Sequence, residues 1–315
     1  MSILNISQSA IGNGANTALP SYSLQMGLVV GAILVDPSFA LAEADLADAA
    51  TAIAKLQEAV LETGKNKIWP IFRFVEVTDN SEDPTTAKLG YGSEYTVKDG
   101  KYHWRLRHIV GGLFLHGHLR NFNKTNFSVL IADDNNHLWG TKTTDGKGMR
   151  GLTLEEFYAY PMKIADGTNA AKFEIKLALS KPAELNEDVA FINLNTDIEE
   201  AVKGNIDIEL VQSAVVAGKA TVKLLTKFEK IDLYDTFADE FASGTLWTCS
   251  KAGVPVVISG VVKNATAKGW DVSFTGTGVH VIGLTTAKLL AAANIGGAPD
   301  NGYEGNTLSV TMPAP

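Results

Sequence analysis

Four histidines stand close together in the sequence and are the side chains best suited to metal chemistry. His103, His108, His116 and His118 lie within sixteen residues, and imidazole is a common metal ligand. In a strand, residues two apart point to the same side, so His116 and His118 would share one face. The pair Gly111-Gly112 is expected to bulge that strand, and no cysteine or repeated carboxylate spacing completes a ligand set. We interpret them as strand histidines at a surface or interface and predict no metal site.

The run Asp133-Asp134-Asn135-Asn136 carries the oxygen-bearing side chains that calcium prefers. A calcium loop of the EF-hand type also needs a glycine at its sixth position and a glutamate at its twelfth, and this run has neither. Asp and Asn side chains favour chain reversals because they hydrogen bond to nearby backbone groups. We therefore predict a turn here.

Nothing in the sequence matches a known catalytic pattern. Cys249 and His280 are a thiol and an imidazole in the same stretch, but nothing places them together, and a buried structural thiol is the default. No GxSxG motif occurs, and Gly111-Gly112 and Gly296-Gly297 have neither dinucleotide nor Walker spacing. Glu155-Glu156 is typical of a solvated face. We predict no catalytic residue, no cofactor and no enzymatic activity.

Binding to nucleic acid is not favoured by the charge. The net charge is -8, whereas a grip on phosphates needs clustered Lys and Arg. A short basic and aromatic group offers a stacking platform for single strands, but no wider basic field surrounds it, and cross-strand packing is the better interpretation. Its members are Tyr102, Trp104, Arg105, Arg107 and His108.

The bulk properties are those of a globular protein of two domains. The chain has 315 residues, of which 45% are hydrophobic, enough for one large core and one small core. A single cysteine rules out an internal disulfide and suits a reducing cytoplasm. The first residues lack the pattern of a secretory signal, and the longest apolar run, 27–35, is too short to span a bilayer.

The order of elements predicts a mainly β fold with one amphipathic helix. Residues 1–22 are expected to form a flexible arm, 23–35 a strand, and 41–63 the helix, because its apolar residues recur at helical spacing and Gly64 follows. Residues 68–77 are strand-like, and Pro70 places them at a sheet edge or a strand start. Residues 78–87 are expected to form a polar, acidic loop.

The stretch from Leu89 to Tyr160 reads as a β-meander that organises the chain. Two strand-like runs are expected to form a hairpin at Asp99-Gly100, since this dipeptide suits the positive φ of a tight turn. A second hairpin is expected around Asp133–Asn136. Further on, 171–179 alternates as a strand, and two longer strands are expected to meet at Ala217-Gly218-Lys219.

The domain boundary is predicted near residue 245, after an acidic and aromatic stretch. Residues 23–245 would form the large β domain and 246–315 a small immunoglobulin-like sandwich, because short β runs follow one another there, separated by Gly, Asn and Asp. The smaller part has four Lys against three acidic residues, a net charge of +1, so the first 245 residues carry a net charge of -9.

The layout resembles that of virion structural proteins of tailed bacteriophages. The likeness lies in the polar arm, the strand and helix, the segments IWPIFRF and GYGSEYTVKDGKYHW, and the run LRNFNKTNFSVLIADDNNHLWGT followed by KGMRGLTLEEFYAYPMKI. Within that group it is most similar to tail tube, or major tail, proteins with an immunoglobulin-like C-terminal domain.

That resemblance implies a tail-tube-like β-sandwich or barrel that assembles with copies of itself. Rings, hexameric by resemblance, would stack into a tube, DNA would pass through without sequence-specific binding, and other virion proteins would be partners. The protein would be made in the host bacterial cytoplasm and end in the virion, with no membrane. Two alternatives stay open: a head, neck, minor capsid or decoration protein, and a carbohydrate- or surface-binding module.

Overall fold

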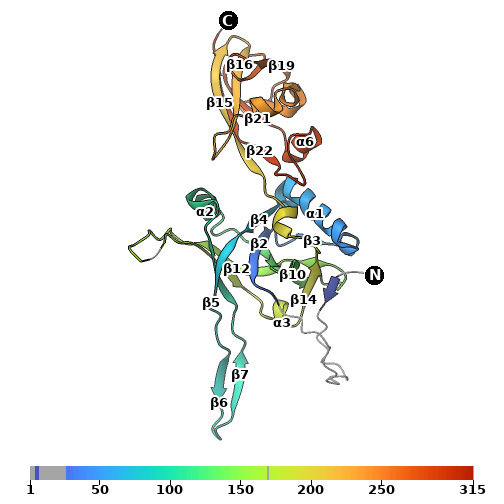
Figure 1. The fold of residues 1–315 in the computed structure, drawn as a ribbon, viewed down its shortest axis with the longest axis vertical. Coiled ribbons are helices and arrows are strands. Elements are labelled where there is room, and N and C mark those ends of the chain that lie inside the picture. The colour runs from blue at the N-terminus through green and yellow to red at the C-terminus, as the bar shows by residue number, and fades with distance from the viewer. Residues whose placement is uncertain (1–3, 7–25, 169, 315) are drawn as a thin grey trace. The chain divides into compact units, whose positions relative to one another are not determined.

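This computed structural model describes residues 4–6, 26–168 and 170–314. The chain divides into two compact units, the first made of residues 1–56 and 64–202 and the second of residues 57–63 and 203–315. The fold is mainly β, as the sequence predicted (Figure 1). The expected flexible arm, 1–22, lies outside the described residues except for Leu4–Ile6, which forms strand β1 and pairs with β14.

The first unit is built on one large sheet. Its main path runs β1-β14-β10-β9-β12-β13-β8-β5, with β2 added on the free side of β9 and β4 paired to β2. Strand β12 joins the two halves of the sheet, because Leu152 and Thr153 pair with β9 and residues from Leu154 onward pair with β13. The register of the second pairing shifts just after Leu154. The strands are β2 (Val29–Val35), β3 (Ala40–Leu41), β4 (Ile68–Phe72), β5 (Phe74–Asp79), β8 (His103–His108), β9 (Ser128–Asp133), β10 (His137–Lys142), β11 (Met149–Arg150), β12 (Leu152–Ala159), β13 (Phe173–Leu179) and β14 (Val189–Asn193).

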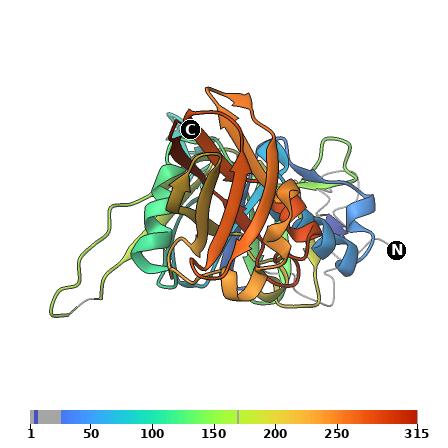
Figure 2. The same ribbon diagram turned by 90° about the horizontal axis from the view of Figure 1, so that it is seen from above.

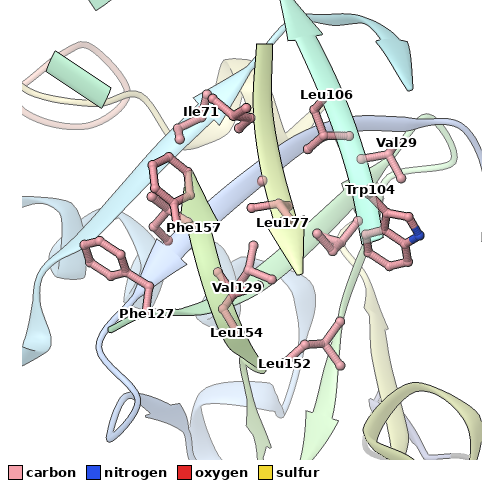
Figure 3. Packing of buried hydrophobic residues seen from close by; sticks show 14 of the residues in the cluster. Val29, Ile71, Trp104, Leu106, Phe127, Val129, Leu152, Leu154, Phe157 and Leu177 are labelled. Carbon is pink, nitrogen blue, oxygen red and sulfur yellow. The ribbon is translucent and has the colours of Figure 1, made fainter. Parts of the chain in front are cut away.

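The core of the first unit lies between these two halves (Figure 3). Val129 and Ile71 come from one half, and Leu106, Phe157 and Leu177 from the other. Alternation along β8 and β13 predicts this burial, because every second side chain of a strand points to the same face. Pro70 lies on β4, which pairs only with β2, so the predicted edge position is confirmed.

A long hairpin extends from this sheet and differs from the predicted one. Strands β6 (Thr85–Lys88) and β7 (Glu94–Lys98) pair with each other, and the chain reverses at 89–93 rather than at Asp99-Gly100. The ladder continues from β5 into β6 and from β7 into β8, since the amides of Asn80 and Glu82 donate to the carbonyls of His103 and Lys101. The predicted loop 78–87 is therefore mostly one leg of this hairpin, and the predicted strand 68–77 is broken at Arg73, whose φ is 64°.

Gly100 is needed for close approach and not for a turn. A Cβ at this position would lie 1.7 Å from the carbonyl oxygen of Glu82 on the opposite leg. Only a glycine lets the two backbones approach so closely. The Asp99-Gly100 dipeptide therefore marks a tight point of the ribbon, which explains why its turn-like composition was misleading.

Two of the helices differ from the prediction. Helix α1 (Ala49–Leu61) is shorter than the expected 41–63, because a 3-10 turn (Ala44–Leu46) precedes it and Asp48 caps its start by accepting a hydrogen bond of 2.8 Å from the Thr51 amide. Gly64 follows its end with φ 64°, as expected. Helix α2 (Gly112–Asn121) was not predicted at all. Within the described parts of the chain, no helix is both long and apolar enough to cross a membrane.

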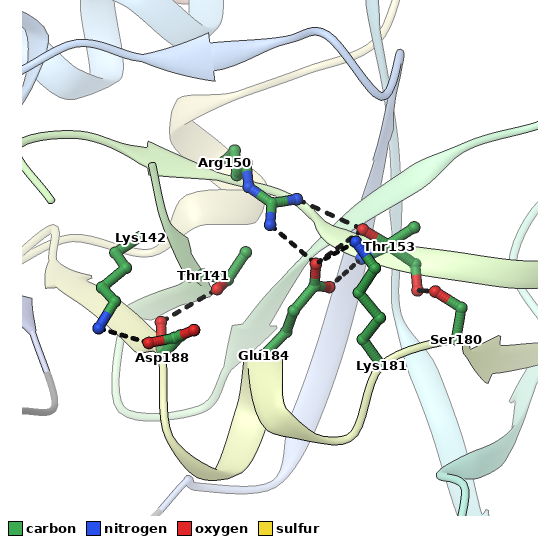
Figure 4. Close-up of polar contacts among 8 residues, drawn as sticks. All are labelled: Thr141, Lys142, Arg150, Thr153, Ser180, Lys181, Glu184 and Asp188. Atoms are coloured by element: carbon green, nitrogen blue, oxygen red, sulfur yellow. Dashed lines mark hydrogen bonds and ion pairs between the residues drawn. The ribbon is translucent and has the colours of Figure 1, made fainter. Parts of the chain in front are cut away.

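A buried carboxylate holds the short helix α3 (Ala183–Asn186) against β11 and β12 (Figure 4). Glu184 accepts hydrogen bonds from the Arg150 guanidinium at 2.8 Å and from the Thr153 amide at 2.6 Å and hydroxyl at 2.9 Å. Its side chain is only 6% exposed. The charge is thus buried but surrounded by donors, an arrangement that is costly to break from one side.

We expect Glu184→Ala to destabilise the first unit by about 1–3 kcal/mol, because it leaves the Thr153 amide without its acceptor, while Arg150, whose side chain is 30% exposed, can be solvated. The measurement is the midpoint of urea denaturation at constant m-value. The matched control is Glu187→Ala, on the same turn of chain but exposed, which should change stability by no more than about 0.5 kcal/mol. Equal losses in both variants would contradict this account of Glu184.

The second unit is a sandwich of two sheets. One sheet has the order β19-β20-β16-β15-β22 and the other β18-β17-β21-β23, and a shared core lies between them. The hairpin predicted at Ala217-Gly218-Lys219 is confirmed by the pairing of β15 with β16. The strands are β15 (Ile206–Val216), β16 (Lys219–Thr226), β17 (Trp247–Lys251), β18 (Val254–Pro255), β19 (Ile258–Asn264), β20 (Gly269–Phe274), β21 (Gly278–Leu284), β22 (Tyr303–Gly305) and β23 (Thr307–Met312).

The division between the units falls at residues 202/203, about 40 residues before the boundary predicted at 245. The reason is aromatic packing. Phe241, in the stretch taken as a boundary, is fully buried in the sandwich core, with its ring 5.4 Å from that of Trp270. Its carbonyl also accepts a hydrogen bond of 2.8 Å from the Trp247 indole. The acidic and aromatic stretch is therefore part of the second unit's core.

Candidate functional site

The four histidines do not form one strand face. His103 and His108 lie on β8, but Gly111 (φ 79°) and Gly112 (φ 48°) begin helix α2, which carries His116 and His118. Residues two apart on a helix point in different directions, so His116 is buried at 2% exposure while His118 is half-buried. The expected bulge is instead a helix start, and the expectation of a shared face for His116 and His118 was wrong.

The structure brings together two of these histidines, His108 and His116. Nε2 of His108 lies 3.2 Å from Nδ1 of His116, and Nε2 of His116 lies 2.5 Å from the carbonyl oxygen of Tyr160. A carbonyl only accepts, so Nε2 of His116 is the donor in its contact with Tyr160. Both rings also pack against Phe173. The arrangement holds two imidazoles in a chain of polar contacts that ties α2 to β8 and to Tyr160, the residue after β12.

Burial lowers the pKa of His108, and the facing His116 lowers it further, against a smaller opposing effect of the Val110 backbone. The folded chain therefore keeps His108 neutral, whereas the unfolded chain takes up a proton as the pH falls through the ordinary value of 6.5. The stability that this group contributes is present above that pH and is lost as the pH falls below it.

We expect the unfolding free energy of the wild type to decrease between pH 7 and pH 5 with a slope of at most about 1.4 kcal/mol per pH unit for this one proton. His108→Gln removes the titrating group, so the slope should flatten by that amount even if the variant is less stable throughout. His103→Gln, on the opposite face of β8, is the control and should keep the slope. Denaturant titrations at several pH values measure all three. An unchanged slope in His108→Gln would refute the assignment.

The acidic run around Asp133 forms a turn, as predicted. Asp133 is 1% exposed and accepts hydrogen bonds from the amides of Gly27, Asn135 and His137, at 2.9 to 3.0 Å, and from the Trp139 indole at 2.8 Å. Burial raises the pKa of this carboxyl, but the hydrogen bonds together outweigh it, so the pKa is lowered. Both carboxylate oxygens accept hydrogen bonds from backbone amides or from the indole, so the role of Asp133 is to hold the turn in place.

The remaining candidates for catalysis are also placed in structural roles. Burial raises the pKa of the Cys249 thiol, which disfavours the nucleophilic thiolate. The His280 ring packs against Phe274, and its Nδ1 lies 3.1 Å from the carbonyl of Gly278. Glu155 and Glu156 are exposed, as expected of a solvated face, and form ion pairs with Lys101 and Lys176.

The basic and aromatic group on β8 is divided between two faces of the sheet. Trp104 is buried, whereas Arg105 lies over the ring of Tyr160, 4.8 Å from its centroid, and Arg107 pairs with Glu76 at 3.2 Å. The predicted cross-strand packing is confirmed, with Trp104 opposite Leu177. Among residues 26–168 and 170–314, no three His, Cys, Asp or Glu side chains are grouped so that they could hold a metal ion.

The distal part of the hairpin is the most exposed regular element of the first unit. Every residue from Glu82 to Asp99 is exposed except Ala87. Ala87 stands directly opposite Tyr95, and Lys88 opposite Glu94, so the ribbon has an apolar face and a charged face. The exposed apolar residues form what we call the hairpin cluster: Leu89 (53% exposed), Tyr91 (100%), Tyr95 (51%) and Val97 (58%).

A second exposed apolar group lies around the start of α2. We call it the helix patch: Ile109 (53% exposed), Val110 (49%), Leu113 (58%) and Phe114 (63%). Helix α2 lies beside the loop that joins β12 to β13 (Figure 2). The inner face of the same helix carries His116 and Leu119, both 2% exposed. Helix α2 is thus held from one side by buried contacts and presents apolar side chains on the other.

Both surfaces were missed in the sequence, although signals for each were present. Gly90 and Gly92 flank Tyr91 and mark the true reversal, but the Asp99-Gly100 dipeptide was a stronger turn signal. Leu115 and Leu119 recur at helical spacing in α2, but the four histidines and two glycines of this stretch interrupt the apolar periodicity.

Comparison of the chain with protein-family models, with curated proteins and with solved structures finds no match. The function therefore has to be argued from the fold and from these two surfaces.

Proposed function

We propose that this chain is a structural subunit of a tailed-bacteriophage virion, a tail-tube protein that assembles with copies of itself into stacked rings around a passage for DNA. The observation that carries the proposal is the hairpin of β6 and β7, an amphipathic two-stranded ribbon whose apolar face is open to solvent. The layout of the sequence, which resembles that of tail tube proteins, supports the same proposal.

A two-stranded ribbon needs a surface to pack on. Isolated hairpins are at best marginally stable in water, and three strands or a packed face are needed for independent stability. Full burial of a side chain such as Leu or Val contributes about 1.5–3 kcal/mol. An exposed apolar face on an otherwise regular element marks an interaction site, and an exposed strand edge is a template for pairing with another chain.

The charge of the protein suits a passage for DNA. The net charge is -8, and a lumen lined by fixed negative charge repels phosphates, so DNA would slide without adhering. Asp133 and His116, two of the side chains with catalytic potential, are by contrast engaged in hydrogen bonds within the fold. Assembly explains the exposed hairpin, whereas a reaction centre would leave it unexplained.

We expect the wild-type protein to self-associate with rising concentration and the double variant Leu89→Ser, Tyr95→Ser to associate more weakly by about 30-fold. The estimate takes about 1 kcal/mol for each truncated contact residue. Sedimentation analysis measures the association, and negative-stain microscopy shows whether the assemblies are rings or tubes.

The matched control is Lys88→Ser, Glu94→Ser, which changes the neighbouring positions on the charged face and removes one exposed ion pair of 3.0 Å without altering net charge. It should assemble like the wild type, because exposed ion pairs contribute little. A wild type that stays monomeric at high concentration, or a control as defective as the apolar variant, would overturn the proposal.

A further inference from the structure

We infer that the buried contact between His108 and His116 is an acid-sensitive switch, which releases the first half of helix α2, between Gly111 and Gly117, from the sheet when the pH falls. The rest of the first unit stays folded in the released state. This inference goes beyond the proposed function, because it concerns a change within a single copy of the chain.

Both imidazoles are closed off from solvent. His108 is 0% exposed and His116 is 2% exposed, and 3.2 Å separate Nε2 of the first ring from Nδ1 of the second. Phe173 on β13 packs against both rings, and Phe74 on β5 stands opposite His108 in the strand register. A proton taken up by His108 therefore enters a site lined by aromatic rings.

The charged side chains of the neighbouring strands point away from this site. Arg107 precedes His108 on β8, and Glu174 on β13 stands opposite Arg107. Because successive side chains of a strand alternate between faces, both lie on the other face of the sheet. Glu76 on β5 lies on that face as well, since it forms an ion pair of 3.2 Å with Arg107. The strands thus place no carboxylate against the two imidazoles.

The helix and the end of β12 do not supply a carboxylate either. Arg120 is one turn beyond His116 on α2 and is exposed, and as a cation it opposes the uptake of a proton nearby. Tyr160 accepts a hydrogen bond from Nε2 of His116 at its carbonyl, while its hydroxyl lies 3.4 Å from Arg105 on the other face. Among the described residues, the groups that contact the two rings therefore carry no negative charge.

A proton on His108 has no good place in the closed structure. A charged imidazole donates from both nitrogens, but Nδ1 of His108 is buried without a hydrogen-bond partner among the described residues. Burial lowers the pKa of this ring and the facing His116 lowers it further, against a smaller effect of the Val110 backbone. A buried charge without partners costs free energy that water would supply. Acid therefore favours a conformation in which α2 moves away and the ring meets water.

The far end of α2 is held by groups that do not titrate between pH 5 and pH 7. The side chain of Asn123 accepts a hydrogen bond of 2.7 Å from the Ala159 amide and donates one of 3.1 Å to its carbonyl. The ring of Phe122 packs edge-on against those of Trp69 and Phe127. This end stays attached in acid, so the release is local.

Glycines bound the segment that is released. Gly111 and Gly112, at the start of α2, have φ values of 79° and 48°. Gly117 lies between the histidine contact and Asn123, and a Cβ there would meet no other part of the chain within 4 Å. Packing therefore does not require a glycine at 117, while a glycine within a helix makes the helix easier to unwind than an alanine would. The helix can separate at this point.

The test is amide hydrogen exchange of the full-length wild type at pH 7, 6 and 5, corrected for the intrinsic pH dependence of exchange. Amides 115–118, whose helical acceptors lie at 111–114, should exchange faster by up to about tenfold per pH unit below the ordinary histidine value of 6.5, as expected for one proton. No acceleration at these amides would overturn the inference. Dilute monomer is used, so this result does not bear on the proposed assembly.

Low concentrations of urea show whether the opening is local. Local opening exposes little surface, so exchange at 115–118 should depend only weakly on urea, whereas amides of β13 should follow global unfolding and its full m-value. A full m-value at 115–118 would show that the helix is released only when the whole unit unfolds, and would overturn the inference.

The imidazole variants identify the titrating group. His108→Gln should abolish the acceleration in acid, even where exchange at pH 7 is already faster than in the wild type. His118→Gln, on the same helix but outside the contact, is the matched control and should keep it. Acceleration that survives in His108→Gln, or that disappears in His118→Gln, would assign the proton to another group and refute the switch.

Gly117→Ala tests the opening without touching an imidazole, and it keeps the test decisive where His108→Gln fails to fold. Alanine stabilises the closed helix, so exchange at 115–118 should slow by about 2- to 5-fold at every pH while the pH dependence stays the same. Exchange that is unchanged by this substitution would mean that the helix does not unwind here, contrary to the inference.

Discussion

In a two-stranded ribbon each strand has only one neighbour, and neither face is covered by a further layer of the sheet. This constraint decides which apolar side chains of the first unit are exposed. Near its base the ribbon is part of the large sheet, because β8 pairs with β13 as well as with β5. From His103 toward the tip of the hairpin, β13 no longer pairs with the ribbon. Among the described residues, β6 and β7 there pair with each other alone. The residues on the outer ribbon nevertheless include Leu89, Tyr91 and Tyr95. Apolar side chains held on a regular but uncovered ribbon are consistent with contact to another molecule.

The side chains with chemical potential serve the scaffold. The imidazoles of His108 and His116 link α2 to the sheet, the Asp133 carboxylate gathers amides around the β9–β10 turn, and Glu184 binds Arg150 and Thr153. The carboxylates of Asp133 and Glu184 each accept several hydrogen bonds, which is the usual condition for burying such groups, whereas Nδ1 of His108 is buried without a partner among the described residues. These contacts hold the helices and strands of the first unit together.

The second unit buries its apolar side chains between two sheets. Its two sheets cover each other, and Trp270, Trp247 and Phe241 fill the space between them. The second unit nevertheless also exposes large apolar side chains on its outside, among them Val254 at 66%, Val257 at 83% and Val262 at 64%.

The sequence by itself determined the features that depend on neighbouring residues. The turn at Asp133–Asn136, the hairpin at Gly218 and the alternating strand β13 all follow from local hydrogen bonding, positive φ and period-two burial. Only the tertiary structure decided features set by residues far apart in the chain. Gly100 meets Glu82 across the ribbon, Phe241 meets Trp270, and His116 meets His108 and Tyr160. Such partners leave no local pattern, so the weak local signals for the long hairpin and helix α2 could not be ranked above stronger ones, and the boundary at residue 202 had no local signal. The mainly β class could be, because it is the sum of many local preferences.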